Sequence, residues 1–192
     1  MSQKYREKIL HTSLTLFMKH GFHATGIDKI VAEAGIAKMT LYKYFPSKEA
    51  LIMAVLQMRD QAWRTWFQTE IENFPTHSPQ EKILIIFDVL ASWFKKDSFH
   101  GCAFINASAE FSEQTHPAHL FAALHKQYVQ NYIHDLINAL EIANAGALSR
   151  QICLLMDGAI VHAQITHNPD VAFEAKNAAT LLLHTACLSQ KE

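Results

Sequence analysis

The sequence has few of the features that mark secreted, membrane-bound or zinc-stabilised proteins. It contains three cysteines without CxxC spacing, which argues against a disulfide scaffold and against a structural zinc site. Its purely apolar stretches, such as residues 50–56 and 83–87, are far shorter than the roughly 20 residues of a membrane-spanning helix. The first residues, MSQKYREK, include no apolar signal region. We therefore expect a cytoplasmic protein with no membrane partner.

Motifs for catalysis and metal binding are missing as well. No nucleophile and base pair, phosphate-binding loop or paired-carboxylate site stands in a recognisable motif, so an enzyme is not expected. The chain has twelve histidines, but it lacks HExxH, and it lacks the pair of Glu-x-x-His motifs of a ferritin-type site, since only Glu113 and His116 have that spacing. The pair His116 and His119 has no third ligand close in sequence. We expect neither a metal nor a cofactor.

The distribution of charge is more informative than its total. Of 192 residues, 49% are apolar and 18% are charged, which indicates a globular chain with a substantial core. The net charge is −1, yet residues 1–50 hold eight basic and four acidic side chains, while the other 142 hold nine and fourteen. A basic N-terminal part on an acidic body suits a protein that meets phosphate groups with one end only.

Strand signals are nearly absent, and apolar residues recur with the 3.6-residue period of a helix. The sequence therefore predicts an all-α fold of about nine helices. Gly21, Gly35 and Pro46 are expected to end the first three helices, Ser47 to cap the fourth, and Gly146 to interrupt the chain. The expected helices are Tyr5–His20, Ile27–Ala34, Lys38–Tyr44, Lys48–Asn73, Pro79–Lys96, Cys102–Ser112, Pro117–Ala143, Leu148–Thr166 and Val171–Leu188.

The first 47 residues have the layout of a helix-turn-helix. Three short helices, with Gly35 at the tight turn between the second and third, form the minimal unit in which the third helix enters the major groove of DNA. Apolar residues such as Ile30 and Leu41 are expected to face inward. The residues expected to face outward are Lys38, Met39, Thr40, Tyr42, Lys43 and Tyr44. We call residues 1–47 the head and expect residues 48–192 to form a ligand-binding and dimerisation domain.

At these residues the sequence resembles a known family. The run GFHATGIDKIVAEAGIAKMTLYKYFPSKEALIMAVL is similar to the N-terminal signature of TetR (tetracycline-repressor-like) regulators. This resemblance implies phosphate contacts at Thr25, Thr40, Tyr42, Tyr44 and Lys48, and contacts to bases at Lys38, Met39 and Lys43. For Tyr42 and Tyr44 the alternative role is packing, and for Lys48 it is plain solvation. The sequence departs from the common pattern at Gly26, Val31, Ala37 and Met39, which affects the expected DNA preference.

The segment GCAFINASAEF resembles a G-C-x-x-x-N-x-x-x-E pattern in one branch of the same family. Cys102, Asn106 and Glu110 are spaced by four and share one helical face. They either line a ligand pocket or satisfy neighbouring backbone and loop groups. Together with aromatic residues they define the candidate effector site, which is Trp63, Phe67, Cys102, Phe104, Asn106, Glu110, His125 and Tyr128.

The last two helices are expected to form a homodimer. Small residues allow close helix approach, and residues 178–183 are apolar nearly all round, which a helix on a monomer surface does not sustain. The resulting prediction is a repressor that binds operator DNA as a dimer and is released by a largely apolar small molecule. The alternatives are a sensor of electrophiles or oxidants acting through Cys102, an activator, or a family member that signals without DNA.

Overall fold

The computed structural model describes residues 2–76, 78–142 and 144–188. Within these ranges every regular element is a helix, as the sequence predicts, and no strand occurs. The helices belong to two compact units. None of the described helices is long and apolar enough to cross a membrane.

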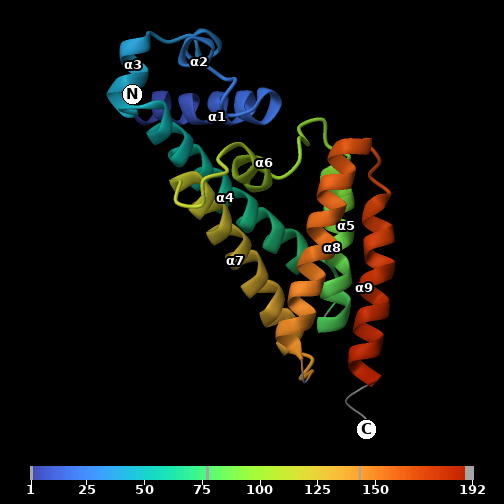
Figure 1. Cartoon of the computed structure of the whole chain (residues 1–192). Coiled ribbons are helices and arrows are strands. Elements are labelled where there is room, and N and C mark those ends of the chain that lie inside the picture. Colours follow the sequence, from blue (N-terminus) through green and yellow to red (C-terminus); the bar gives the residue numbers. More distant parts are fainter. Residues whose placement is uncertain (1, 77, 143, 189–192) are drawn as a thin grey trace. The chain divides into compact units, whose positions relative to one another are not determined.

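The first unit comprises the chain up to Trp63 together with residues 102–125. Its helices α1, α2 and α3 pack against one another, as Figure 1 shows. Fully buried apolar side chains, among them Phe17, Ile30 and Leu41, fill the space between them. The helices are α1 (Ser2–His20), α2 (Ile27–Ala34), α3 (Lys38–Tyr44), the first part of α4 (Lys48–Glu72), α6 (Ala103–Glu110) and the start of α7 (Pro117–Asn138).

The ends of these helices follow local sequence signals. Gly35 adopts the left-handed conformation with φ of 60° and closes α2, where the amide of Ile36 donates to the carbonyl of Val31 at 3.1 Å. α3 ends at Tyr44, one residue before the Phe45 that precedes Pro46. Ser47 Oγ accepts the amide of Ala50 at 3.0 Å and thereby caps α4, as predicted.

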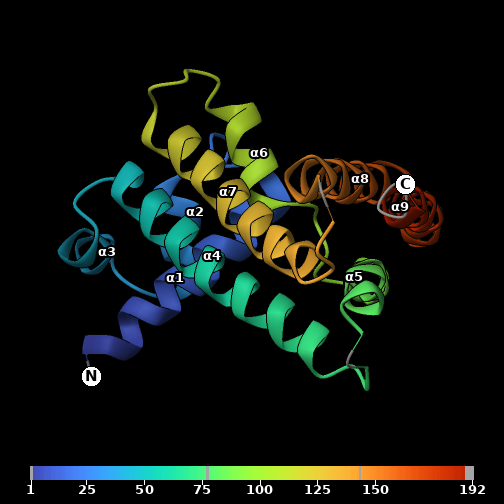
Figure 2. The same cartoon turned by 90° about the horizontal axis from the view of Figure 1, so that it is seen from below.

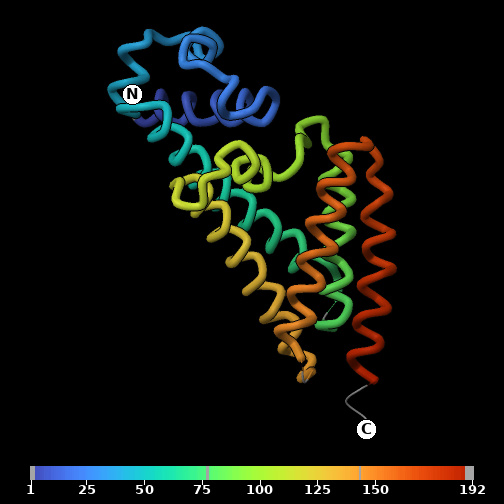
Figure 3. Tube along the Cα trace, viewed as in Figure 1, coloured from blue at the N-terminus to red at the C-terminus, as the bar shows by residue number. Residues whose placement is uncertain are grey.

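The second unit comprises residues 64–101 and those from Lys126 onward. Its helices are α5 (Pro79–Phe94), α8 (Ala145–Thr166), α9 (Val171–Leu188) and the remaining parts of α4 and α7. α5, α8 and α9 lie side by side (Figure 2), and the trace in Figure 3 shows α9 running antiparallel to α8. Lys176 of α9 forms an ion pair with Asp88 of α5 at 2.5 Å.

Several predicted helix limits differ from the structure. α8 begins at Ala145, so Gly146 lies in its first turn and does not interrupt the chain, because the carbonyl of Asn144 already accepts the amide of Leu148 there. α7 ends at Asn138, and Glu141 follows in the left-handed conformation with φ of 56°. The predicted end of that helix, residue 143, lies outside the described residues. α5 and α6 are also shorter than predicted.

The two compact units do not follow the expected division at residue 47. α4 continues without a break from one unit into the other, and α6 returns to the unit that contains the head. The division into a DNA-binding part and a ligand-binding part therefore remains a functional prediction.

Candidate functional site

The third helix presents an exposed surface of cations, aromatic rings and one thioether. Leu41 is fully buried and anchors α3, while Met39 is 86% exposed and Tyr42 is 43% exposed. Lys38 and Lys43 are exposed as well. These side chains offer donors and apolar atoms of the kind that read phosphates and base edges in a DNA groove.

Lys38 is engaged within the head. Its ammonium group forms an ion pair with Asp28 of α2 at 2.8 Å, and this hydrogen bond raises the pKa of Lys38 above its ordinary value. Both side chains are largely exposed, and an exposed pair of this kind contributes little to stability. The lysine can therefore exchange Asp28 for a DNA phosphate or base at small cost.

Thr25 differs from the other residues assigned to DNA. Its side chain is fully buried, and its hydroxyl donates to the carbonyls of Gly21 at 2.7 Å and Leu16 at 3.3 Å. The hydroxyl thus satisfies backbone acceptors at the C-terminal end of α1. A phosphate contact from this side chain does not fit its burial. Thr40 and Tyr44 are partly exposed.

A cluster of polar contacts holds the turn between α1 and α2. The Glu110 carboxylate at the end of α6 accepts the backbone amides of Phe22 at 2.8 Å and His23 at 2.7 Å. Lys48 Nζ donates to the carbonyl of His23 at 3.0 Å, and burial lowers the pKa of Lys48, an effect that Glu110 partly offsets. We call Glu110, Lys48 and the backbone of Phe22 and His23 the turn clamp.

The turn clamp gives two predicted site residues a structural role. For Glu110, the sequence left open a ligand pocket or the satisfaction of loop groups, and in this structure its oxygens bind the two turn amides. For Lys48 the family resemblance implies a DNA phosphate contact, and in this structure its ammonium group binds the carbonyl of His23 in the same turn. The rings of His23 and Phe111 pack beside the clamp with centroids 4.6 Å apart.

Three of the predicted effector residues meet in the first unit. The imidazole of His125 on α7 stacks on Phe104 of α6 with centroids 3.6 Å apart, and Trp63 of α4 meets the same imidazole edge-on at 5.5 Å. Nδ1 of His125 pairs with Asp60 Oδ1 at 2.7 Å, and both side chains are buried. Sequence reasoning missed Asp60, whose only signal was an acid on the inward face of α4.

The other predicted effector residues do not all join this group. Cys102 is a buried free cysteine that precedes α6, and Asn106 is partly exposed. Phe67 and Tyr128 belong to the second unit, where Phe67 meets Tyr132 edge-on at 6.1 Å and the guanidinium of Arg64 lies 4.6 Å from the Tyr128 ring.

Comparison with known proteins agrees with this architecture. Residues 9–55 match the family described as bacterial regulatory proteins, tetR family. The HTH-type transcriptional regulator YjdC of Escherichia coli is 24% identical over 155 residues, which are 81% of each chain. The regulator YxaF of Bacillus subtilis is 37% identical over 90 residues, 46% of each chain.

A solved structure of a TetR-family transcriptional regulator from Streptomyces coelicolor superimposes with a TM-score of 0.88. It is 27% identical, and the match covers 96% of this chain and 97% of that one. The sequence match, the helical architecture and the exposed third helix thus all indicate a regulator with an N-terminal helix-turn-helix. Together the family match, the named relatives and the solved structure support a TetR-family transcriptional regulator, a kind of DNA-binding regulator rather than an enzyme.

Proposed function

We propose that this regulator is a repressor that binds operator DNA as a homodimer and is released by a largely apolar small molecule. The observation that carries the DNA-binding part is the exposed surface of α3, where Lys38, Met39 and Lys43 project from a helix anchored by fully buried Leu41. The basic charge of the head supports contact with the phosphate backbone.

The exposed faces of α8 and α9 support the dimer. Leu154 and Ile165 of α8 are 71% and 72% exposed, and Leu181 of α9 is 70% exposed, whereas Ile152 and Leu183 are fully buried on the inner faces. Large apolar side chains exposed on two neighbouring helices are typical of a surface that a partner covers. A second copy packed on both helices makes a two-fold interface.

The group around His125 supports an effector site in the first unit. Aromatic surfaces of Trp63 and Phe104 surround one buried polar pair, Asp60 and His125. A mostly apolar environment with a few fixed polar groups is typical of small-molecule sites between helices. A ligand that enters here must part the stacked rings of Phe104 and His125. The roles proposed for Phe67, Cys102, Asn106 and Tyr128 rest on sequence reasoning alone.

Two helices connect this group with the DNA-binding head. α4 carries Lys48 near its start and Asp60 three turns later, and α6 carries Phe104 near its start and Glu110 at its end. A ligand that displaces either helix therefore moves one side of the turn clamp. The ligand regulates DNA binding if it binds the displaced arrangement of the helices more tightly and DNA binds the undisplaced arrangement more tightly. A ligand with equal affinity for both arrangements does not change the equilibrium between them.

Binding to DNA from the region upstream of the protein's own gene tests the proposal. We expect a complex with two protein copies that forms more tightly on this DNA than on random DNA of equal length at the same salt concentration. Candidate ligands are then titrated with and without operator, and linkage requires that the operator weaken ligand binding by the factor by which ligand weakens operator binding, about 5–150-fold. Equal binding to both DNAs contradicts the repressor. Reporter transcription that rises when the protein is bound identifies an activator instead.

A further inference from the structure

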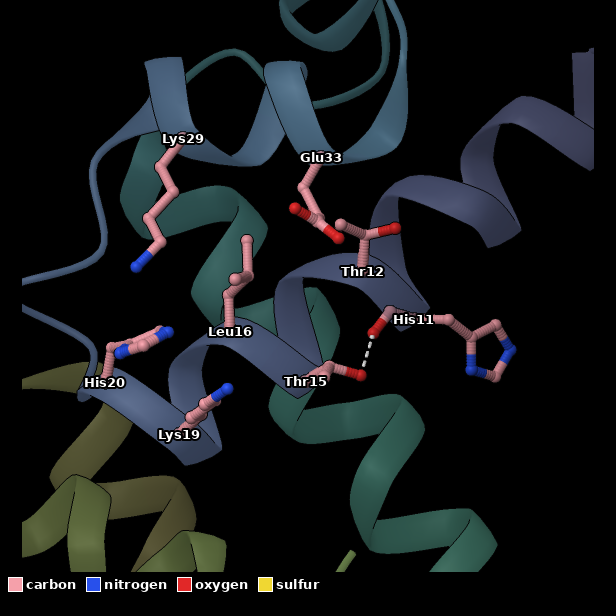
Figure 4. Close-up of a pocket in the computed structure, with 8 residues that line it drawn as sticks. All are labelled: His11, Thr12, Thr15, Leu16, Lys19, His20, Lys29 and Glu33. Carbon is pink, nitrogen blue, oxygen red and sulfur yellow. Dashed lines mark hydrogen bonds between the residues drawn. The ribbon is translucent and has the colours of Figure 1, made fainter.

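A groove of about 430 Å³ lies between α1 and α2, apart from the surfaces discussed so far. Figure 4 shows the side chains that line it. They are His11, Thr12, Thr15, Leu16, Lys19, His20, Lys29 and Glu33. All of these residues except Leu16 carry a polar group on the side chain.

The cationic groups gather at one end of the groove. Lys29 reaches from α2 toward His20 and Lys19 of α1, whereas Glu33 lies near Thr12, away from them (Figure 4). Within the described part of the chain, neither Lys19 nor Lys29 forms an ion pair with a carboxylate. Two ammonium groups and an imidazole therefore gather in one part of the groove, and Glu33, the carboxylate that also lines it, lies apart from them.

This end of the groove is distinct from the recognition surface of α3. Lys29 and Glu33 are four residues apart and share one flank of α2. Asp28, one residue earlier and about 100° around the helix, points to the other flank and pairs with Lys38 of α3. The groove is therefore a second basic feature of the head.

The His20 ring experiences the positive potential of this space. Loss of hydration lowers its pKa, and repulsion from Lys29 and then Lys19 lowers it further. The other titratable groups that line the groove are His11 on α1 and Glu33 on α2. A bound anion offsets the repulsion and favours the protonated imidazole, which then becomes a third cationic donor.

We propose that Lys19, His20 and Lys29 form a binding site for a phosphate group. Three donors that converge from two helices match a tetrahedral anion with several oxygens better than a carboxylate with two. The same chemistry is offered by a free phosphorylated small molecule and by the backbone of DNA. The first source is independent of the function proposed above, and the second depends on it.

Inorganic phosphate is the probe for the free ligand. The ring signals of His20 are followed by NMR as phosphate replaces chloride at constant ionic strength. We expect a saturable shift and a rise of the His20 pKa, and a weaker response to acetate. Lys29→Gln and Lys19→Gln should each lower the phosphate affinity about tenfold, as expected for one charge-assisted hydrogen bond. Glu33→Gln should raise it, and exposed Lys95→Gln serves as the charge-matched control.

Duplex DNA is the probe for the second source. If the DNA backbone occupies the groove, Lys19→Gln and Lys29→Gln should each reduce the slope of log affinity against log salt by about 1, relative to Lys95→Gln. If the lysine variants change the salt dependence of DNA binding but phosphate gives no saturable shift of His20, the site binds the DNA backbone. If phosphate gives a saturable shift and the salt dependence is unchanged, the site binds a free ligand. The proposal is overturned if phosphate and chloride act alike on His20 and the slope is unchanged. If the parent protein does not bind DNA, the repressor proposal fails and the phosphate titration alone decides this one.

Discussion

The carboxylate of Glu110 and the backbone amide of His23 are hydrogen-bonded at 2.7 Å although 87 residues separate them in the chain. The second carboxylate oxygen takes the neighbouring amide of Phe22. One side chain at the end of α6 therefore satisfies two adjacent backbone donors in the turn that leads into the helix-turn-helix.

Replacing Glu110 should loosen this turn. We expect Glu110→Ala to lower the free energy of unfolding by about 2–3 kcal/mol, because hydrogen bonds to a charged group are lost and two amides lose their acceptor. Hydrogen exchange at the amides of Phe22 and His23 should become faster. Glu113→Ala, at an exposed acid in the following loop, should change the stability by less than about 0.5 kcal/mol. Unchanged exchange at both amides would contradict the turn clamp.

The exposed lysine in the last turn of α3 tests base reading. If Lys43 contacts a guanine edge, Lys43→Ala should relax discrimination at one operator position by about 1–3 kcal/mol. Affinities for a set of operators with single base changes measure this effect. A uniform loss of affinity across the set would instead assign Lys43 to a phosphate.

The start of α3 has no side-chain cap. Ala37 occupies the N-cap position with φ of −74° and ψ of 146°, an extended conformation that serine adopts readily. Ala37→Ser should therefore supply an acceptor for an unpaired helix amide and stabilise the head by about 0.5–2 kcal/mol. Slower amide exchange in α3 is the readout. Ala32→Ser, at an exposed position within α2, should bring no such gain.

The proposed dimer face can be tested by substituting an acidic residue for an exposed leucine in it. Leu154→Glu and Leu181→Glu should each shift the protein from dimer to monomer, because an unpaired carboxylate within an apolar interface is strongly unfavourable. Sedimentation analysis at several concentrations provides the measurement. Leu120→Glu is the matched control, since Leu120 is 56% exposed on α7 and lies outside the proposed face. An unchanged dimer in both α8 and α9 variants would place the interface elsewhere.

Alkaline conditions should destabilise the second unit. Burial raises the pKa of Tyr132 to about 12 and that of Cys153 to about 12, so both groups hold their protons in the folded state at pH values where the unfolded chain has lost them. Their contribution to stability is complete below the unfolded pKa values of about 9–10 and is lost as the pH rises toward 12. The Tyr132 hydroxyl is buried without a hydrogen-bond partner among the described residues, so Tyr132→Phe should fold and weaken this pH dependence. Tyr5→Phe, at an exposed tyrosine, should leave it unchanged.

The helix ends that the sequence predicted correctly are determined by residues close to one another in the chain. Gly35 closes α2, Pro46 follows the end of α3, and Ser47 caps α4 through an amide three residues away. Helical periodicity is equally local, so the all-α fold could be predicted. The error at Gly146 has the same origin, since glycine is a weak breaker within the first turn of a helix, where amides have no intrahelical partner.

The candidate site could be predicted only in part because its contacts join distant segments. Phe104 and His125 were expected on chemical grounds, but nothing near Asp60 indicates that His125, 65 residues later, becomes its partner. Glu110 was expected to face either a ligand or a loop, and only the fold identifies the turn it reaches. Thr25 occupies the expected register, yet its burial follows from the packing of α1 against the segment before α2.

The path of the chain between the two compact units limits how the regulator can be recombined. The chain leaves the first unit after Trp63, returns at Cys102 and leaves again after His125. A fragment that ends at residue 47 contains the helix-turn-helix but not the carboxylate of Glu110, which holds its first turn. A chimera with a single junction at residue 47 thus joins this head to the remaining domain of another regulator. The amides of Phe22 and His23 then face the α6 helix of that regulator in place of their own. We therefore expect a transfer of DNA specificity between relatives to cost less stability when residues 102–125 are exchanged as well, or when the recipient already has an acid at the position of Glu110.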